Sequence, residues 1–288
     1  MKRCITKQNL MEFRRYLYEE EKSPATIHKY LRDLQKLMDH LKERELSKKE
    51  IISFKEQLKD SGKYQISSIN SFLAAWNSFF AYMGWQELRV KTFRVQKKAF
   101  MPDNKNLTKQ EYQRLVRTAE RKGQGRLSLI LETICATGIR ISELSEITVS
   151  CVIRGTANIY CKGKERQILI PRDLQKKLLY YIRKNGLTGG IVFKTSNGKA
   201  VDRSNIWKEM KLLCDEAGVD REKVFPHNLR HLFAKSFYQI EKDIAKLADV
   251  LGHSNIETTR IYIRTSGYEH RRQLEAMGLV LDVQKNTT

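Results

Sequence analysis

The sequence is short of prolines, of cysteines and of long apolar runs, and each shortage excludes a class of protein. Only 4 of the 288 residues are proline, so proline-rich extended segments are excluded and most of the chain can form helices. The 5 cysteines are scattered without a Cys-x-x-Cys pair, which argues for reduced thiols rather than a disulfide framework. No uncharged apolar run of about eighteen residues occurs, and the first residues lack the apolar core of a signal peptide. We therefore expect a largely helical, cytoplasmic protein that does not span a membrane.

Acidic residues are also too few to balance the basic ones. The chain has 54 Lys and Arg against 33 Asp and Glu, a formal net charge of +21. Residues 1–100 and residues 101–288 both carry a basic excess, so the charge does not come from a single tail. Such a field attracts polyanions, of which nucleic acid is the simplest. A basic protein that is merely soluble would have the same composition, so charge alone leaves both interpretations open.

Apolar residues at helical spacing divide residues 1–88 into amphipathic segments. They predict four helices, over residues 6–20, 24–41, 47–58 and 66–83. Ser23 before Pro24 is a typical helix start, and Ser47 with Glu50 fits a capping box. We therefore expect residues 1–88 to form a small helical domain with a basic outer surface.

The helical periodicity lapses over residues 89–106. Five basic residues precede a Pro-Asp pair in this stretch: Arg89, Lys91, Arg94, Lys97 and Lys98. We interpret residues 89–106 as a basic linker between two domains, suited to run along a duplex, although a solvated charge run has the same composition. Residues 107–288 would then form the second domain.

The second domain mixes helix and strand patterns. A capping box at Thr108 and Glu111 opens it, and an apolar helix over residues 127–136 ends at Gly138. The other expected elements are strands over residues 158–161, 166–170 and 191–193, a tight turn over residues 162–165, and a helix capped by Ser204 that reaches residue 217. The expected fold class is therefore mainly α (α+β), with a small antiparallel sheet in the second domain.

Residues 224–265 carry the residue types of a phosphate-cutting site. A proline predicts a helix start directly before His227, so His227 and Arg230 would lie on adjoining faces of that helix. His253 follows a Leu-Gly pair at the end of the next apolar helix, where an imidazole can reach an anion. Tyr262 comes nine residues later. These side chains together would suit attack of a tyrosine on a phosphate.

Each of these residues also has an ordinary explanation. A lone histidine is more often structural or solvated, and a tyrosine in a mixed apolar and polar segment is usually packing. His227 and His231 are four residues apart and could bind zinc, but no third ligand stands at a familiar spacing and no His-Glu-x-x-His motif is present. We interpret His231 as structural. The case for a site rests on the whole constellation rather than on any member.

Six positions along the chain match one protein family in order. They are Arg140 in ATGIRISEL, Lys162 in KGKER, His227 and Arg230 in HNLRH, His253 in LGH, and Tyr262. In these motifs the chain resembles the tyrosine recombinases, the phage-integrase and Xer-like family, nearly from end to end. The segment SPATIHKYLRDL resembles the start of the family's helical core-binding domain, and residues 107–288 resemble its catalytic domain. The resemblance implies that the two domains form a C-shaped clamp on DNA.

The resemblance also implies how the reaction proceeds. Arg140 and Arg230 would hold the non-bridging oxygens of the scissile phosphate, since each presents a planar fork of donors. Tyr262 would attack the phosphorus and form a 3′-phosphotyrosine, which conserves the bond energy for rejoining. The reaction would need no cofactor and no metal.

Proton transfer falls to the other matched residues. By resemblance, His227 would assist Tyr262 as a base and His253 would donate to a phosphate oxygen. Lys162 would protonate the departing 5′-oxygen. The hairpin reads CKGKER, one residue shorter than the family's common form, so Lys164 remains an alternative to Lys162.

The resemblance further implies the partners. They are double-stranded DNA and other copies of the chain, as a homotetramer on two DNA sites with exchange of C-terminal tails, with accessory proteins possible and a bacterial, nucleoid-associated location. Glu143, three residues after Arg140, is expected to orient that arginine by charge pairing, unless it is a surface carboxylate. Two other activities fit the same residues: a type IB-like topoisomerase, and a non-catalytic DNA-binding protein of the same fold.

Overall fold

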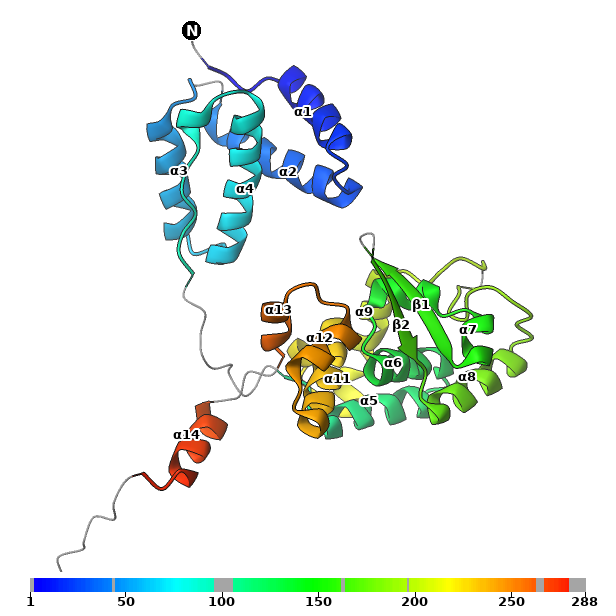
Figure 1. The fold of residues 1–288 in the computed structure, drawn as a ribbon. Helices are drawn as coiled ribbons and strands as arrows, with labels where there is room; N and C mark the ends of the chain where they lie inside the picture. The colour runs from blue at the N-terminus through cyan, green and yellow to red at the C-terminus, as the bar shows by residue number, and fades with distance from the viewer. Residues whose placement is uncertain are drawn as a thin grey trace, which may run out of the picture. The chain divides into compact units, whose positions relative to one another are not determined.

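The computed structural model describes residues 3–42, 45–95, 106–161, 164–195, 197–262 and 267–279. The chain divides into two compact units, Met1–Lys97 and Lys98–Thr288 (Figure 1). Helices make up most of both, and the described residues contain one sheet, of two antiparallel strands, in the second unit. The predicted fold class, mainly helical with a small antiparallel sheet, is confirmed. Within these described ranges, no helix is long and apolar enough to cross a membrane.

The first unit consists of helices. They are α1 (Lys7–Glu19), α2 (Pro24–Leu41), α3 (Lys48–Asp60), α4 (Ile66–Tyr82) and the short 3₁₀ helix η1 (Gln86–Leu88). Ser23 Oγ accepts a hydrogen bond from the N–H of Thr26, and Ser47 Oγ accepts one from the N–H of Glu50. Each serine thus satisfies a donor that the helix itself leaves unpaired. The four predicted helices are confirmed to within two residues of their expected ends.

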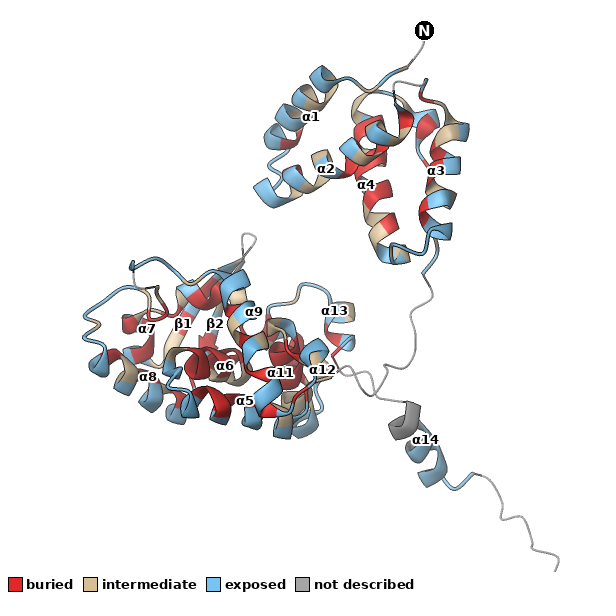
Figure 2. Ribbon diagram, turned by 180° about the vertical axis from the view of Figure 1, so that it is seen from behind, coloured by how far each residue is buried: buried red, intermediate tan, exposed pale blue. Residues whose placement is uncertain are grey.

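Helix α4 lies at the centre of the first unit's core, and Figure 2 shows its buried residues facing the neighbouring helices. Trp76 and Phe79 of α4 are fully buried. The indole of Trp76 stacks on Phe54, with 5.5 Å between ring centroids. Its Nε1–H donates to the backbone oxygen of Asp33 at 2.8 Å, because a buried indole donor needs a partner. Trp76 therefore ties α4 to both α2 and α3.

Two asparagines of α4 hold the chain that follows the helices. Asn77 and the backbone of Val90 exchange two hydrogen bonds, both 2.8 Å long. Asn70 and the backbone of Phe93 do the same at 2.9 and 2.8 Å. The first part of the stretch interpreted as a linker is thus fixed to the first unit. Residues 96–105 lie outside the described part of the chain, so the domain boundaries drawn from the sequence remain predictions.

The second unit surrounds one hairpin with helices. Its elements are α5 (Lys109–Arg121), α6 (Gly125–Thr137), η3 (Ile141–Glu146), α7 (Val149–Arg154), β1 (Thr156–Cys161), β2 (Lys164–Leu169), α8 (Arg172–Lys184), α9 (Arg203–Leu212), α10 (Cys214–Ala217), η4 (Arg221–Lys223), α11 (Pro226–Glu241), α12 (Ile244–Leu251), α13 (Ile256–Arg260) and α14 (Gly267–Ala276). The predicted capping box between Thr108 and Glu111 is confirmed by its two reciprocal hydrogen bonds. The predicted cap at Ser204 is wrong, because Asp202 accepts the hydrogen bonds that start α9.

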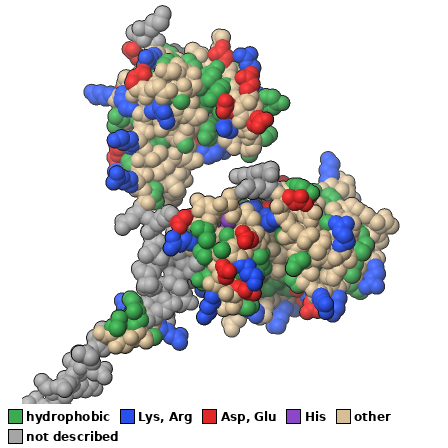
Figure 3. All heavy atoms as spheres, in the orientation of Figure 1, with side chains coloured by type: hydrophobic (Ala, Val, Ile, Leu, Met, Phe, Trp, Pro, Cys, Tyr) green, Lys and Arg blue, Asp and Glu red, His purple; other side chains and the backbone are tan. Residues whose placement is uncertain are grey.

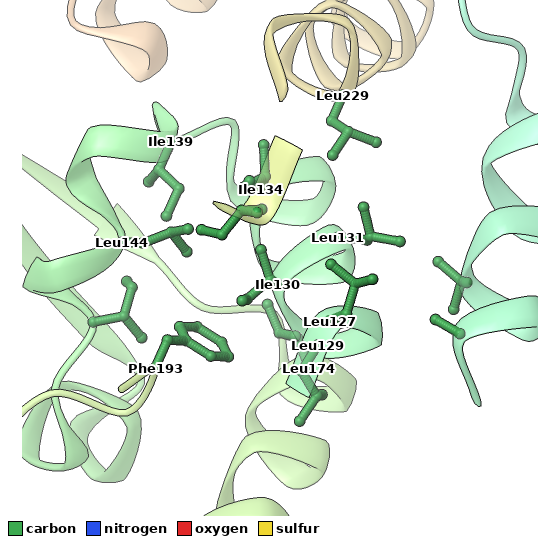
Figure 4. Close-up of a cluster of buried hydrophobic side chains, with 14 of the residues drawn as sticks. Leu127, Leu129, Ile130, Leu131, Ile134, Ile139, Leu144, Leu174, Phe193 and Leu229 are labelled. Carbon is green, nitrogen blue, oxygen red and sulfur yellow. The ribbon is translucent and has the colours of Figure 1, made fainter. Parts of the chain in front are cut away.

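Helix α6 forms the centre of the second unit's core. Figure 4 shows the apolar side chains that gather around it: Leu127, Leu129, Ile130, Leu131, Ile134, Ile139, Leu144, Leu174, Phe193 and Leu229. Gly138 ends the helix with a φ of 67°, and a β-carbon there would lie 2.4 Å from Phe233 Cδ1. Both the left-handed backbone and the close approach require glycine. The chain can therefore turn sharply out of the core just before Arg140.

The hairpin places one face on the core. Ala157 pairs with Ile168 and Ile159 pairs with Arg166 in the register of β1 and β2, and the three apolar residues among them are buried. Strand β2 begins at Lys164. The predicted turn over residues 162–165 is therefore too long, because only residues 162 and 163 separate the strands, and these two lie outside the described residues.

Residues 191–193 do not form the predicted strand. Ile191 makes an isolated antiparallel bridge to Thr148, and the N–H of Val192 donates to the oxygen of Ile147 at 2.9 Å. Val192 is fully buried. An apolar run of three residues is enough to fill a gap in the core, but it is too short to extend the pairing into a strand.

Candidate active site

Arg140 is the N-cap residue of η3 and lies two residues after Gly138, which ends α6. Glu143 lies one turn further on and is 4% exposed. Its Oε2 accepts a hydrogen bond from the backbone N–H of Arg140 at 2.8 Å, and its Oε1 accepts one from Arg140 Nη1 at 2.9 Å. The charge pair expected from the sequence is therefore present. The side chain of Arg140 is 35% exposed, so a ligand can reach it.

Arg230 lies in the second turn of α11 and is 1% exposed. Its Nη1 donates to the backbone oxygen of Gly138, and its Nη2 donates to that of Leu251 at 2.7 Å. These two oxygens are at the ends of α6 and α12, where helical carbonyls lack partners. Burial, followed by the charge of Arg140, lowers the pKa of Arg230 to about 10, which still leaves the guanidinium charged at neutral pH. Arg230 thus joins three helices with a single buried cation.

His253 follows the left-handed Gly252 that ends α12. Its Nε2 is 3.0 Å from Arg230 Nη2, and its Nδ1 is 2.9 Å from Thr259 Oγ1. Because a guanidinium can only donate, Nε2 of the neutral ring accepts and Nδ1 carries the proton toward Thr259. Burial, with the charges of Arg230, Arg140 and Arg166, lowers the pKa of His253 to about 4. The ring is therefore neutral at pH 7 in this arrangement.

Tyr262 follows the short helix α13 and is buried, with 4% of its surface exposed. Its ring centroid lies 5.6 Å from that of His227, 4.7 Å from that of His231 and 5.7 Å from that of His253. A hydrogen bond between Tyr262 and Arg230 acts to raise the pKa of that arginine, against burial. The structure therefore brings Tyr262 to three of the positions predicted from the sequence.

The two histidines of α11 differ in exposure, because His227 is exposed and His231 is buried. Partial desolvation of the ring, then the charges of Arg230 and Arg140, lowers the pKa of His227, so its imidazole is neutral at pH 7 and can act as a base. Burial lowers the pKa of His231 to about 4, and its buried Nε2 has no hydrogen-bond partner among the described residues. The ring of His231, which the sequence predicts to be structural, packs on Tyr262. The i, i+4 spacing from His227 was the signal that both rings share one face.

Two contacts of the site were missed in the sequence. Arg166 of β2 donates from Nη1 to Glu143 Oε1 at 3.1 Å and from Nη2 to Glu143 Oε2 at 2.7 Å. Thr259 of α13 is fully buried and bonds to His253. An available signal for Arg166 was its alternation with Ile168, which put a charged residue on the buried face of a strand. Thr259 carried no comparable signal.

Lys162, the predicted general acid, lies outside the described residues. Lys164, the alternative, opens β2. The choice between the two lysines therefore remains a prediction. Among the residues that the structure describes, no group of three or more His, Cys, Asp or Glu side chains could hold a metal ion.

The assembled side chains form a positively charged site around a phenol. Arg140, Arg166 and Arg230 surround Glu143 and the neutral His253, so positive charge exceeds negative charge there. Forked, permanently charged donors match the oxygens of a phosphate. The arrangement can therefore bind an anion with several oxygens and place it next to the Tyr262 hydroxyl.

Sequence comparisons place both units in known families. The model described as "Phage integrase family" matches residues 105–268, and that described as "Phage integrase, N-terminal SAM-like domain" matches residues 10–87. "Tyrosine recombinase XerA" of Pyrococcus furiosus is 28% identical over 289 residues and is covered to 96%, as is this chain. "Tyrosine recombinase XerD" of Oceanobacillus iheyensis is 29% identical over 269 residues, which cover 83% of this chain and 87% of the relative.

Solved structures share the fold. A lambda integrase(75-356) dimer bound to a COC′ core site matches with a TM-score of 0.71 and 17% identity, over 98% of this chain and 99% of that one. XerH site-specific recombinase in a post-cleavage complex with palindromic difH substrate matches with a TM-score of 0.69 and 20% identity, over 88% of this chain and 79% of that one. At these identities the likeness establishes the fold of the two units.

Proposed function

Because the chain belongs to the phage integrase family and is a tyrosine-type site-specific DNA recombinase, we propose that Tyr262 is the nucleophile that cuts and rejoins the DNA strand. One observation supports this assignment above the others. Tyr262 is 4% exposed and lies among His227, His253 and Arg230, all predicted from sequence motifs. A tyrosine that served only as packing would not need a buried guanidinium next to it.

The arginines would stabilise the transition state. Negative charge develops on the non-bridging oxygens as the phosphorus becomes pentacoordinate, so donors already in place lower the barrier without reorganising. Arg140 has a partly exposed side chain and would bind these oxygens directly. Arg230 is held by two backbone oxygens and His253, so an incoming phosphate oxygen would join or replace the contact to His253.

The histidines would handle protons. His227 is neutral at pH 7 and is close to the Tyr262 ring, so it would accept the phenolic proton. His253 would donate to a phosphate oxygen, although its Nε2 accepts from Arg230 in the unliganded site. To donate from that atom, the ring would gain a proton or exchange tautomers. A bound phosphate favours this, because its negative charge raises the pKa of a neighbouring imidazole.

The proposed partner is double-stranded DNA, held by both units. On the face drawn in Figure 3, lysine and arginine side chains are spread over both units rather than gathered in one segment. The proposed assembly is a homotetramer on two DNA sites, in which C-terminal tails are exchanged. Helix α14 suits such a tail, because Leu274 and Met277 at its end are more than half exposed. Accessory proteins, a clamp-like closure on DNA and a cytoplasmic, nucleoid-associated location belong to the same proposal.

A nicked suicide duplex tests the activity. The nick lets the short strand beyond the cut diffuse away, so the reaction stops at the covalent stage. The wild-type protein should form an adduct that survives denaturant and links the chain to a 3′-phosphate. Two intact duplexes carrying the target site should then exchange strands. Absence of any adduct would contradict the proposal, and supercoil relaxation without strand exchange would indicate a topoisomerase.

Substrates with a sulfur at the 5′-bridging position identify the general acid. A thiolate has a much lower pKa than an alkoxide and leaves without a proton. Lys162→Ala should therefore fail to cut an ordinary duplex and should recover on the sulfur substrate. Arg230→Ala should not recover, because its deficit lies at the non-bridging oxygens. Rescue of Lys164→Ala in place of Lys162→Ala would move the role to Lys164, and rescue of neither would point to a histidine.

A further inference from the structure

Arg166 lies on the buried face of the hairpin, where apolar residues are the rule. It is paired with Ile159 across the strands and alternates with Ile168, and both of these neighbours are buried. The side chain of Arg166 is only 11% exposed. Burying a guanidinium costs free energy unless its donors are paired, so this position calls for an explanation beyond hairpin packing.

Glu143 accepts hydrogen bonds from both terminal nitrogens of Arg166. The same carboxylate also accepts the backbone N–H and the Nη1 of Arg140, so each of its oxygens receives two hydrogen bonds. Burial acts to raise the pKa of Glu143, but the hydrogen bonds from Arg166 and Arg140 outweigh it and leave the pKa lowered. The carboxylate is therefore charged and saturated, and it joins the hairpin to the start of η3.

The stem of Arg166 also touches the turn that carries His253. A β-carbon on Gly252 would lie 2.6 Å from Arg166 Cδ and 3.0 Å from its Nη1. Gly252 has a φ of 65°, so it serves both the left-handed turn and the close approach of the arginine. Arg166, a residue of β2, is thus in contact with two other segments, namely η3 and the end of α12.

We propose that Arg166 is a positioning residue that acts on Arg140 through Glu143 and links the hairpin to the rest of the site. This inference rests on the proposed function of the site. Nη1 and Nη2 of Arg166 each donate to Glu143, so its ion pair is made with that carboxylate, through which it acts on Arg140. Without Arg166, Glu143 would have free acceptor positions, and Arg140 would fold onto the carboxylate as a bidentate pair. The guanidinium of Arg140 would then be drawn away from the phosphate.

Single-turnover cleavage of the suicide duplex, measured beside the dissociation constant for DNA, tests this role. A displacement of about 1 Å in a catalytic group can lower a rate about a hundredfold. Arg166→Ala should therefore slow cleavage by about ten- to a hundredfold while DNA affinity and melting temperature change little. Arg166→Lys should recover part of the rate, since an ammonium keeps the ion pair but not the fork. Arg126→Ala is the matched control: Arg126 pairs with Glu209 in the same unit, at 3.0 Å, and should leave cleavage unchanged.

A double-mutant cycle separates coupling from a general structural role. If Arg166 acts through Glu143, Arg166→Ala should cost little further cleavage in a Glu143→Gln background. Additive losses, an unchanged rate in Arg166→Ala, or a loss of DNA affinity equal to the loss of rate would each overturn the inference. Should Arg166→Ala fail to fold, the same cycle is run with Arg166→Lys. Failure of the proposed function is distinct, because the wild-type chain itself would then form no adduct.

Discussion

Replacing Tyr262 with phenylalanine should abolish the covalent adduct and leave DNA binding intact. The substitution removes only the hydroxyl, and the ring can keep its place among His227, His231 and His253. No other atom at that position can attack phosphorus, so the loss should be complete rather than partial. Denaturing electrophoresis on the nicked duplex measures the adduct, and a mobility shift at fixed salt measures binding, since affinity for DNA depends steeply on salt.

The control for Tyr262→Phe is a second tyrosine of the same cluster. Tyr238 packs against the small apolar group that includes Tyr262, so Tyr238→Phe removes a hydroxyl from the same neighbourhood. It should form the adduct at the wild-type rate. An adduct that persists in Tyr262→Phe would show that another residue attacks, and Tyr268 would then be tested next.

Arg230→Lys should lower both cleavage and stability. Loss of one preorganised donor at a developing oxyanion slows an enzyme about a hundred- to a thousandfold. The lysine would also leave the backbone oxygens of Gly138 and Leu251 without their present donors in a buried site. Each unsatisfied group costs about 1–3 kcal/mol, so the melting temperature should fall clearly. Single-turnover cleavage and thermal unfolding measure the two effects.

Arg140→Lys should separate the loss of cleavage from the loss of stability. It also replaces a fork with a point charge, so cleavage should fall to a similar degree. The side chain of Arg140 is 35% exposed, however, and it supports no carbonyl at a helix end among its described contacts. The melting temperature of the Arg140→Lys variant should therefore stay near that of the wild type. Equal destabilisation by both substitutions, or near-normal cleavage by Arg140→Lys, would contradict the assigned roles.

Local signals in the sequence were sufficient for the helices. The structure has side-chain caps at Ser23, Ser47 and Thr108. A hydroxyl directly before a helix accepts a hydrogen bond from a backbone N–H that has no partner within the helix. The strand predicted over residues 191–193 is wrong, because these residues are buried by tertiary packing rather than by pairing within a sheet. The predicted hairpin turn is too long, because the length of a turn depends on where strand pairing starts, and composition does not reveal that position.

For the site, too, local motifs could be predicted from the sequence and long-range contacts could not. Arg140, His227, Arg230, His253 and Tyr262 stand in ordered motifs, and the structure brings them together. Contacts made across long sequence separations could not be predicted. Arg166 meets Glu143 from 23 residues away, and Arg230 reaches the oxygen of Gly138 from 92 residues away. Such contacts depend on how helices and strands pack against one another, and no local pattern in the sequence specifies that packing.

The hydrogen bonds that Asn70 and Asn77 of α4 make to the following chain bear on the avidity of the two units for DNA. Because Asn70 and Asn77 fix the chain as far as Phe93, the connection to the second unit starts there rather than at the end of the helices. Once one unit holds a duplex, the other meets it at a high effective concentration instead of from free solution. The entropy of that closure changes only with the logarithm of the length of the connection. Because that dependence is logarithmic, the few residues that Asn70 and Asn77 remove from the connection change the avidity for DNA only slightly.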